Sequence, residues 1–388
     1  MLLKCKRPKA QRYRPVVSLL STSALFAVAI VGGSVLQSGL SAVLPDEPAS
    51  VADASVVVTG SHTVVSEQTE ILHVAVSAPH MEISGSRLDW QTRVTGTSSW
   101  RTIDTLRLDS DGKVPVRVAP WKAAEYRAVF PGSRAVAPAA SEAFRVDTRP
   151  AGVEVAHPPG APQPHISPST DPARRSRAIG EGANAVVSLI PDPVWARMTG
   201  VSFAENCPVG RGDLRYVQVN YWGFDGYRYR GEIVVHESIA EQAAAIFADL
   251  YRLRYPIRQM RLADDFGKDP LKGADDYASM AADNTSGFNC RYVDGKEEQR
   301  VLSPHAWGMA IDINTWENPF EARTGVFPHP YYLDRSRSHR AALQGPESPV
   351  VRAFENRGLQ WGGRWSEKDY HHFETPPASR PGEKRASS

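Results

Sequence analysis

The hydrophobic and polar positions of the chain follow four successive patterns. The first is an uncharged, largely apolar run from residue 16 to about residue 44. A basic cluster precedes it, formed by Lys4, Lys6, Arg7, Lys9, Arg12 and Arg14. Because about 20 apolar residues can span a bilayer, residues 1–44 are predicted to be a secretory signal or an N-terminal membrane anchor. Either interpretation places the rest of the chain outside the cell or in the cell envelope.

The second pattern is an alternation of apolar and polar residues in short runs rich in Val, Thr and Ser. Turn residues separate these runs, and no helical period lies between them. Strands of this length and spacing predict a β-sandwich of immunoglobulin or fibronectin type over residues 51–148. Trp90 and Tyr126 are expected to lie in its core. We interpret this unit as a spacer or a binding module.

The third pattern is a stretch rich in Pro, Ser, Ala and Gly. Its prolines are Pro158, Pro159, Pro162, Pro164, Pro168 and Pro172. Such a composition cannot bury enough apolar surface to offset the entropy that ordering costs. Residues 149–180 are therefore predicted to be an extended linker between two folded units. The last residues, 378–388, are predicted to be a disordered tail.

The fourth pattern mixes strand and helix periods over residues 181–377. Two alternating segments flank an Asp225-Gly226 turn signal and predict a β-hairpin over residues 214–235. Apolar residues then recur at helical spacing until Pro256, and residues 257–262 are expected to form a strand. Strands and helices in this irregular order, without a glycine-rich phosphate loop, predict an α+β domain with an antiparallel sheet.

Length and charge narrow the functional classes. A chain of 388 residues exceeds the usual size of one domain, which agrees with two folded units. The formal net charge of +2, from 45 basic and 43 acidic residues, gives no basic surface of the kind that binds nucleic acid. We therefore expect no nucleic-acid partner, and we expect the chain to act as a monomer.

Export also determines how the cysteines are interpreted. Cys5 lies in the cytoplasmic or discarded segment, which leaves Cys207 and Cys290 as the pair exposed to an oxidising compartment. We predict that these two form a disulfide. Zinc ligation and a cysteine nucleophile are the competing interpretations. Both lack the residues they need, because the sequence has no Cys-x-x-Cys and neither cysteine has a nearby histidine.

Two segments of the second unit carry the side chains of a mononuclear metal site. Residues 303–312 read Ser-Pro-His-Ala-Trp-Gly-Met-Ala-Ile-Asp, and residues 369–374 read Asp-Tyr-His-His-Phe-Glu. A catalytic zinc typically takes three ligands from histidine and carboxylate, keeps one position for water, and needs a carboxylate to accept the proton of that water. Asp369 is the predicted base. The predicted metal ligands are His305, Asp312 and His372.

Neighbouring residues are assigned supporting roles. His371 is not chosen as a ligand, because the spacing from Asp369 favours His372 and strand alternation would point His371 away. Glu374 is either an acceptor that orients a ligating histidine or a solvated carboxylate. Tryptophans close to the motifs are expected to form walls of the pocket. They are Trp307, Trp316, Trp361 and Trp365.

The two motifs together resemble those of a known peptidase family. Zinc D-alanyl-D-alanine carboxypeptidases of VanY type, and the related L-alanyl-D-glutamate endopeptidases of phage lysins, show Ser-x-His-x-x-Gly-x-Ala-x-Asp followed by Asp or Glu-x-x-His. The chain is similar to them at Ser303, His305, Gly308, Ala310, Asp312, Asp369 and His372. The resemblance covers roughly residues 181–377. It implies the small α+β fold that these peptidases share with the hedgehog signalling domain.

The same resemblance implies a zinc metallopeptidase that cuts peptidoglycan stem peptides next to a D-amino acid. A bound zinc ion (Zn²⁺) would polarise the scissile carbonyl and activate water, and Asp369 would move the proton. The family also uses an arginine from the segment before the first motif to stabilise the oxyanion. Its usual Tyr-Arg-Ser sequence is absent here, so Arg291 is the first candidate and Arg258 the second. Ser303 is expected to hydrogen-bond the substrate or a zinc ligand.

Several functional alternatives stay open at this point. The cut could be that of a D-alanyl-D-alanine carboxypeptidase or that of an L-alanyl-D-glutamate-type cell-wall endopeptidase. A non-catalytic cell-wall-binding protein could keep the zinc domain as a recognition surface. A zinc hydrolase acting on amide bonds outside peptidoglycan is a further alternative. A serine hydrolase is disfavoured, because Ser303 lacks a convincing base and orienting group.

Overall fold

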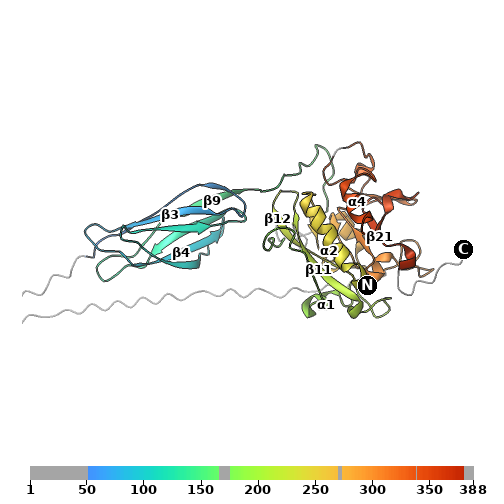
Figure 1. Cartoon of the computed structure of the whole chain (residues 1–388), viewed down its shortest axis with the longest axis horizontal. Helices are drawn as coiled ribbons and strands as arrows, with labels where there is room; N and C mark the ends of the chain where they lie inside the picture. Colours follow the sequence, from blue (N-terminus) through green and yellow to red (C-terminus); the bar gives the residue numbers. More distant parts are fainter. Residues whose placement is uncertain (1–50, 166–174, 270–272, 338, 380–388) are drawn as a thin grey trace, which may run out of the picture. The chain divides into compact units, whose positions relative to one another are not determined.

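The computed structural model of the chain describes residues 51–165, 175–269, 273–337 and 339–379. These residues form a mixed structure of α-helices and β-strands in which strands dominate (Figure 1). Within these ranges no helix has the length and apolar character needed to cross a membrane. The predicted signal or anchor, residues 1–44, lies outside the described residues.

The strands between residues 55 and 149 form two sheets with the orders β1-β3-β6 and β2-β9-β7-β4-β5, and β8 pairs with β7. All pairs are antiparallel except β2 with β9. The strands are β1 (Ser55–Thr59), β2 (Thr63–Val65), β3 (Glu70–Ser77), β4 (Arg87–Val94), β5 (Arg101–Arg107), β6 (Lys113–Val118), β7 (Ala124–Phe130), β8 (Ala139–Ala140) and β9 (Phe144–Arg149).

Both sheets contribute alternate side chains to one buried cluster. In β3, Leu72 and Val74 are buried while His73 between them is exposed. Trp90 of β4 and Tyr126 of β7 are buried in the same cluster, with ring centroids 5.5 Å apart. Alternation with period two is what places one face of a strand against a core and the other in water. The two aromatic residues therefore occupy the core positions that the sequence predicts.

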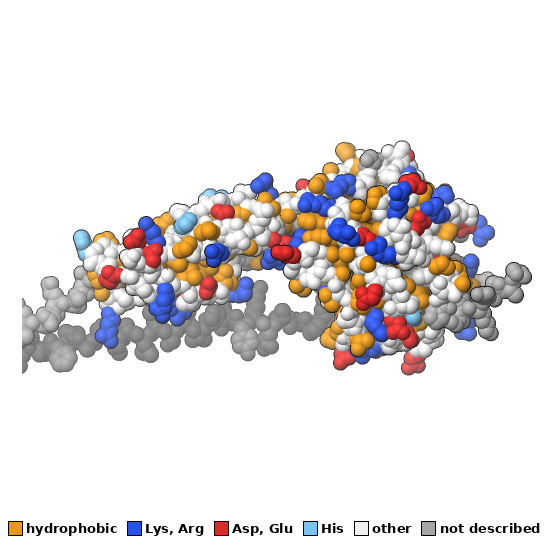
Figure 2. Space-filling view, in the orientation of Figure 1, with side chains coloured by type: hydrophobic (Ala, Val, Ile, Leu, Met, Phe, Trp, Pro, Cys, Tyr) orange, Lys and Arg blue, Asp and Glu red, His pale blue; other side chains and the backbone are white. Residues whose placement is uncertain are grey.

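The segment predicted as a linker, residues 149–180, begins with the last residue of β9, and its described residues 150–165 and 175–180 contain neither a helix nor a strand. Beyond it, the second buried cluster is built from residues 190–373. Acidic and basic side chains are interspersed over the face of the molecule seen in Figure 2. This distribution matches a chain whose formal net charge is only +2.

The second cluster is organised by a long hairpin and one long helix. Strands β11 (Leu214–Trp222) and β12 (Arg228–His236) pair antiparallel along their whole length, and Gly226 has a φ of 71° in the turn between them. Helix α2 (Glu237–Arg252) follows directly, because the His236 side chain accepts the Ser238 N–H and caps its first turn. The predicted hairpin and helix are thus both present.

The remaining elements are short. The helices are α1 (Asp192–Met198), α3 (Asp276–Ala281) and α4 (Pro349–Glu355). The strands are β10 (Val186–Ser188), β13 (Gln259–Met260), β14 (Lys268–Asp269), β15 (Gly273–Ala274), β16 (Asn284–Thr285), β17 (Ala310–Asp312), β18 (Phe320–Ala322), β19 (Gly325–Phe327), β20 (Gln360–Trp361) and β21 (His372–Glu374). Single 3₁₀ turns cover Arg211–Asp213, Ala263–Phe266, Pro304–Trp307, Pro330–Leu333, Gly362–Arg364 and Pro377–Ser379.

One prediction for this unit was too simple, because its strands form several small sheets instead of one antiparallel sheet. The strand expected over residues 257–262 is limited to β13, which pairs parallel with β16. The backbone N–H groups on either side of β13 donate to side chains. The N–H of Arg258 donates to Asn314 Oδ1, and the N–H of Arg261 donates to Asn284 Oδ1. Because these side chains satisfy the donors, the ladder need not extend further.

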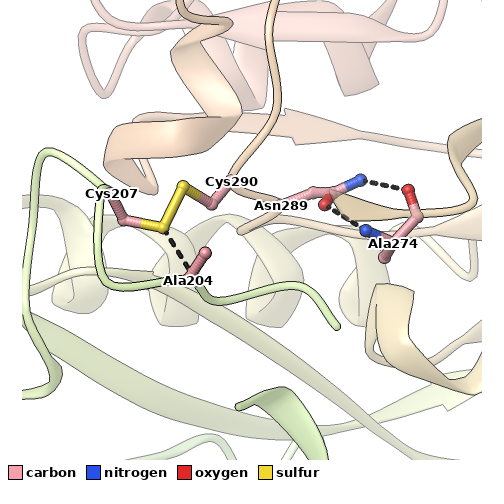
Figure 3. The surroundings of a disulfide bond; sticks show 5 residues. All are labelled: Ala204, Cys207, Ala274, Asn289 and Cys290. Carbon is pink, nitrogen blue, oxygen red and sulfur yellow. Dashed lines mark hydrogen bonds between the residues drawn. A yellow bond between two sulfur atoms is a disulfide. The ribbon is translucent and has the colours of Figure 1, made fainter. Parts of the chain in front are cut away.

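A disulfide joins Cys207 to Cys290, with an S–S distance of 2.03 Å and a Cα–Cα distance of 5.9 Å. The Ala204 N–H donates to Cys207 Sγ at 3.1 Å (Figure 3). On the other side, the Asn289 side chain exchanges two hydrogen bonds with the backbone of Ala274 (Figure 3). The segment that carries Cys290 is thus held by both a covalent bond and hydrogen bonds.

Replacing both Cys207 and Cys290 by alanine is expected to lower the free energy of unfolding by about 4 kcal/mol, because the bridge closes a long loop and restricts the unfolded chain. The cysteines are 83 residues apart in sequence. Denaturant unfolding followed by tryptophan fluorescence measures the change. Cys5→Ala is the control and should unfold like the native protein. Equal unfolding midpoints for the double variant and the native protein would contradict the prediction.

Candidate metal centre

Two adjacent strands bring the ends of the two sequence motifs together. Strand β17 pairs antiparallel with β21, and the register places Asp312 directly opposite His372. Residues directly opposite in a pair project from the same face of the sheet. The result is a contact between motifs that lie 60 residues apart, with Asp312 Oδ1 at 2.9 Å from His372 Nδ1.

A tight turn before β17 adds the second histidine. His305 lies in the 3₁₀ turn Pro304–Trp307, and Ser303 caps this turn by accepting the His305 N–H. The turn ends at Gly308, whose φ is 69°. A Cβ at this position would lie 2.6 Å from the backbone nitrogen of His236. Only glycine suits this backbone conformation and this close approach, which explains the spacing His-x-x-Gly in physical terms.

Three ligand atoms converge at this place. His305 Nε2 lies 3.2 Å from Asp312 Oδ2 and 3.2 Å from His372 Nδ1. Ligands at the usual 2.0–2.1 Å from a tetrahedral zinc are about 3.3 Å from one another. The three side chains are buried, with exposed fractions of 3%, 4% and 6%. The structure therefore brings the three predicted ligands together with spacings that could hold a metal ion.

The other ring nitrogens of the two histidines have their own partners. His305 Nδ1 donates to the carbonyl oxygen of Gly287 at 2.6 Å, which leaves Nε2 free to bind a metal. His372 Nε2 donates to Glu374 Oε2 at 3.2 Å, which leaves the Nδ1 atom of His372 available to bind a metal. Hydrogen bonds of this kind fix the tautomer and the ring orientation of metal-binding histidines. Of the two roles considered for Glu374, the structure favours the acceptor.

Without a metal, the charges of the cluster favour an ionised Asp312 and a protonated His372. Burial favours the neutral form of Asp312, but His305, His371 and hydrogen bonds from the histidines outweigh it and hold the Asp312 pKa well below its usual range. Burial likewise disfavours a charged His372, but hydrogen bonds to Asp312 and Glu374 raise its pKa to about 10. A metal ion bound here would take the place of that proton, since only a neutral imidazole is a ligand.

Asp369 approaches the metal ligands from the segment before β21. Burial raises its pKa from the usual carboxyl value. Its Oδ1 lies 3.2 Å from His371 Nε2, and His371 Nδ1 donates to the carbonyl oxygen of Asn318 at 2.7 Å. The expectation that His371 points away is therefore corrected: it precedes the first residue of β21, so strand alternation does not govern it. Its contact with Asp369 is a feature of the site that sequence reasoning missed.

The metal ligands and Asp369 line a cavity of about 590 Å³. Its walls include the β18–β19 hairpin and residues of helix α3. Of the four tryptophans expected around the pocket, Trp365 lines the cavity, with its ring centroid 5.4 Å from that of His372. Trp307, Trp316 and Trp361 are buried in the domain and do not line it. Their nearness to the motifs in sequence reflects packing beneath the site.

The two candidate arginines occupy different environments. Arg291 lines the cavity beside Ser303, and its Nη2 forms an ion pair with Asp276 at 2.8 Å. Arg258 does not line the cavity, because its guanidinium is held between Asp283 and Glu317, at 2.6 and 3.1 Å. Both of these carboxylates are buried. Arg258 is therefore bound within the fold, and Arg291 is the candidate that can reach a bound molecule.

Comparison with known proteins gives one family match. Residues 296–375 match the family described as D-alanyl-D-alanine carboxypeptidase. The matched segment contains Ser303, Asp369 and all three candidate ligands, and it confirms the resemblance to peptidases of VanY type. Arg291 and the strands of the first unit lie outside it. No curated protein shows significant similarity to the chain.

Proposed function

We propose that this protein is a zinc-dependent peptidase that hydrolyses stem peptides of peptidoglycan next to D-amino acids, as a D-alanyl-D-alanine carboxypeptidase does. One observation carries the proposal: three buried ligand atoms surround one point in a cavity that also contains the carboxylate of Asp369. Metal-assisted hydrolysis needs this combination of ligands and base. The family match supports a peptidase of this kind.

The residues of the cavity have separable tasks in this reaction. A zinc ion held by the three ligands would polarise the scissile carbonyl and make its bound water more acidic. Asp369 would accept the proton of the water and give it to the leaving amine, and burial raises its pKa above the usual carboxyl value, which makes it a stronger base. His371 is fixed by its hydrogen bond to the Asn318 carbonyl, and its ring packs beside the Asp369 carboxylate and limits the movement of that group. The Arg291 guanidinium stabilises the oxyanion, and Ser303 binds the substrate.

The first unit and the ends of the chain are assigned supporting roles. We propose that the two sheets between residues 51 and 148 are an immunoglobulin-like sandwich that serves as a spacer or wall-binding module. Their shared core and their mostly antiparallel pairing support this. Residues 149–180 connect it to the catalytic domain, residues 181–377. Residues 1–44 direct export, so that the active site meets peptidoglycan outside the cell.

Purified full-length protein should release one D-alanine from a stem pentapeptide that ends in D-alanyl-D-alanine. Mass spectrometry of the products identifies the bond that is cut. Incubation with a chelator should remove the activity, and added zinc should restore it, because the water is activated at the metal. Activity that survives complete metal removal overturns the proposed mechanism. Cleavage on the amino side of D-glutamate selects the endopeptidase, and binding without cleavage selects a wall-binding protein.

Arg291→Gln is expected to lower kcat by about 100-fold, the size typical for losing a group that stabilises an oxyanion. Metal content should not change, because the arginine is not a ligand. Arg323→Gln is the matched control, since Arg323 lines the same cavity as an exposed residue. Steady-state kinetics with the pentapeptide give kcat for both variants. A similar loss in the two variants would assign the effect to general attraction of an acidic substrate.

A further inference from the structure

A second cavity, of about 270 Å³, is lined by an excess of basic side chains. Within the described residues it shares no lining residue with the cavity of the metal centre. Strand β12 supplies part of its wall, and Met260 of β13 and the following residue, Arg261, supply another part. The charged residues of the wall are Arg175, Arg197, Arg230, Arg261, Glu232 and Asp265.

Most of these charges are already paired with one another. Arg197 contacts Glu232 at 3.0 Å, and Arg261 contacts Asp265 at 2.8 Å. Arg175 reaches outside the wall to Asp225 at 3.3 Å. These pairs neutralise both carboxylates of the wall. Within the described residues, no carboxylate pairs with the charge of Arg230.

The described hydrogen-bond partners of the Arg230 side chain are all neutral. Its Nη1 donates to the carbonyl oxygen of Asn184 at 2.6 Å and to Asn220 Oδ1 at 3.1 Å, and both acceptors are neutral. Its Nε is buried and has no hydrogen-bond partner in the described part of the chain. Burial lowers its pKa, whereas a carboxylate neighbour would raise it. A partly buried guanidinium is costly unless an anion balances its charge.

The position of Arg230 in β12 explains why its guanidinium stays on the side of the strand away from the core. Along β12, Tyr229 and Gly231 are buried, and Tyr229 belongs to the hydrophobic core. Arg230 and Glu232 alternate with them and so project from the opposite face of the strand. The guanidinium cannot turn into the core. Its Nη1 is held by Asn184 and Asn220, which are not among the lining residues, while other atoms of Arg230 line the cavity.

We propose that this second cavity binds a compact phosphate-type oxyanion, either free phosphate or a phosphate ester. Guanidinium groups bind such oxygens through paired, charge-assisted hydrogen bonds. Ser176, Gln218 and Tyr221 also line the cavity and offer neutral polar groups. A phosphate has more acceptor oxygens than a carboxylate, which suits a wall with several donors. The site is separate from the metal centre, so the inference does not depend on the proposed peptidase activity.

Isothermal titration of full-length protein with inorganic phosphate tests this site. We expect saturable binding with one phosphate per chain, and weaker binding of glutarate, a dicarboxylate of similar charge but greater length. Arg230→Gln should weaken phosphate binding by at least about tenfold, since it removes a charge-assisted hydrogen-bond donor. Arg352→Gln is the control, because Arg352 is an exposed residue of α4 outside this cavity, and binding should not change.

Three results would overturn the proposal. They are no saturable phosphate binding by the native protein, tighter binding of glutarate than of phosphate, and equal phosphate affinity of Arg230→Gln and the native protein. Thermal unfolding of each variant shows whether it is folded. If Arg230→Gln does not fold, Arg197→Gln takes its place, since the Arg197 side chain is 44% exposed and its ion pair contributes little to stability. This variant should also bind phosphate more weakly, and unchanged affinity again overturns the proposal.

Discussion

His305→Ala and His372→Ala are each expected to abolish stoichiometric zinc binding and, with it, all measurable peptide hydrolysis. Each substitution removes one of the three predicted ligands, whose donor atoms lie within 4.8 Å of one another. Losing a hydrogen-bond partner of a ligand typically weakens metal binding by about 10–100-fold. Losing a ligand itself should cost more. Metal analysis of the purified variants and titration with zinc measure the effect.

A histidine away from the site provides the control for these two variants. His73 is an exposed residue of β3 in the first unit, so His73→Ala should keep zinc and activity. Glu374→Gln gives an intermediate case, because it keeps all three ligands but weakens the partner of His372 Nε2. It should reduce zinc affinity without abolishing it. Full zinc occupancy in His305→Ala and His372→Ala would refute the assignment of the centre.

Asp369→Asn is expected to keep zinc and to lower kcat by about 10²–10⁴-fold, the usual contribution of general acid–base catalysis. The amide has nearly the shape of the carboxylate but cannot accept a proton from water. Metal analysis and steady-state kinetics on the same preparation separate the two effects. Glu367→Gln is the matched control, since Glu367 is an exposed carboxylate lining the same cavity. A native kcat in Asp369→Asn would remove this residue from the mechanism.

The sequence predicted the parts of the fold that rest on local chemistry. Alternation and a turn signal were enough for the hairpin of β11 and β12, and helical spacing was enough for α2. The three candidate ligands were identified because their residue types and spacing are rare in combination. Strand register then explains their convergence, since β17 and β21 place Asp312 opposite His372.

The features that sequence reasoning missed depend on contacts between distant segments. Nothing local shows that Arg258 is held by Asp283 and Glu317, so the sequence could rank Arg291 before Arg258 but could not exclude Arg258. The contact of His371 with Asp369 depends on the Asn318 carbonyl, which is 53 residues away. The short length of β13 was unpredictable for a similar reason. On either side of this strand, asparagine side chains from other segments accept the backbone N–H groups that a longer strand would pair.

The turn at Gly308 also links the metal centre to the main helix of its domain. The backbone N–H of His236 donates to the Gly308 carbonyl at 2.8 Å, while the side chain of His236 caps α2. One residue therefore fixes both where the helix starts and where the loop bearing His305 ends. An engineer who grafts this binding motif onto another scaffold would have to transplant the end of the hairpin along with it.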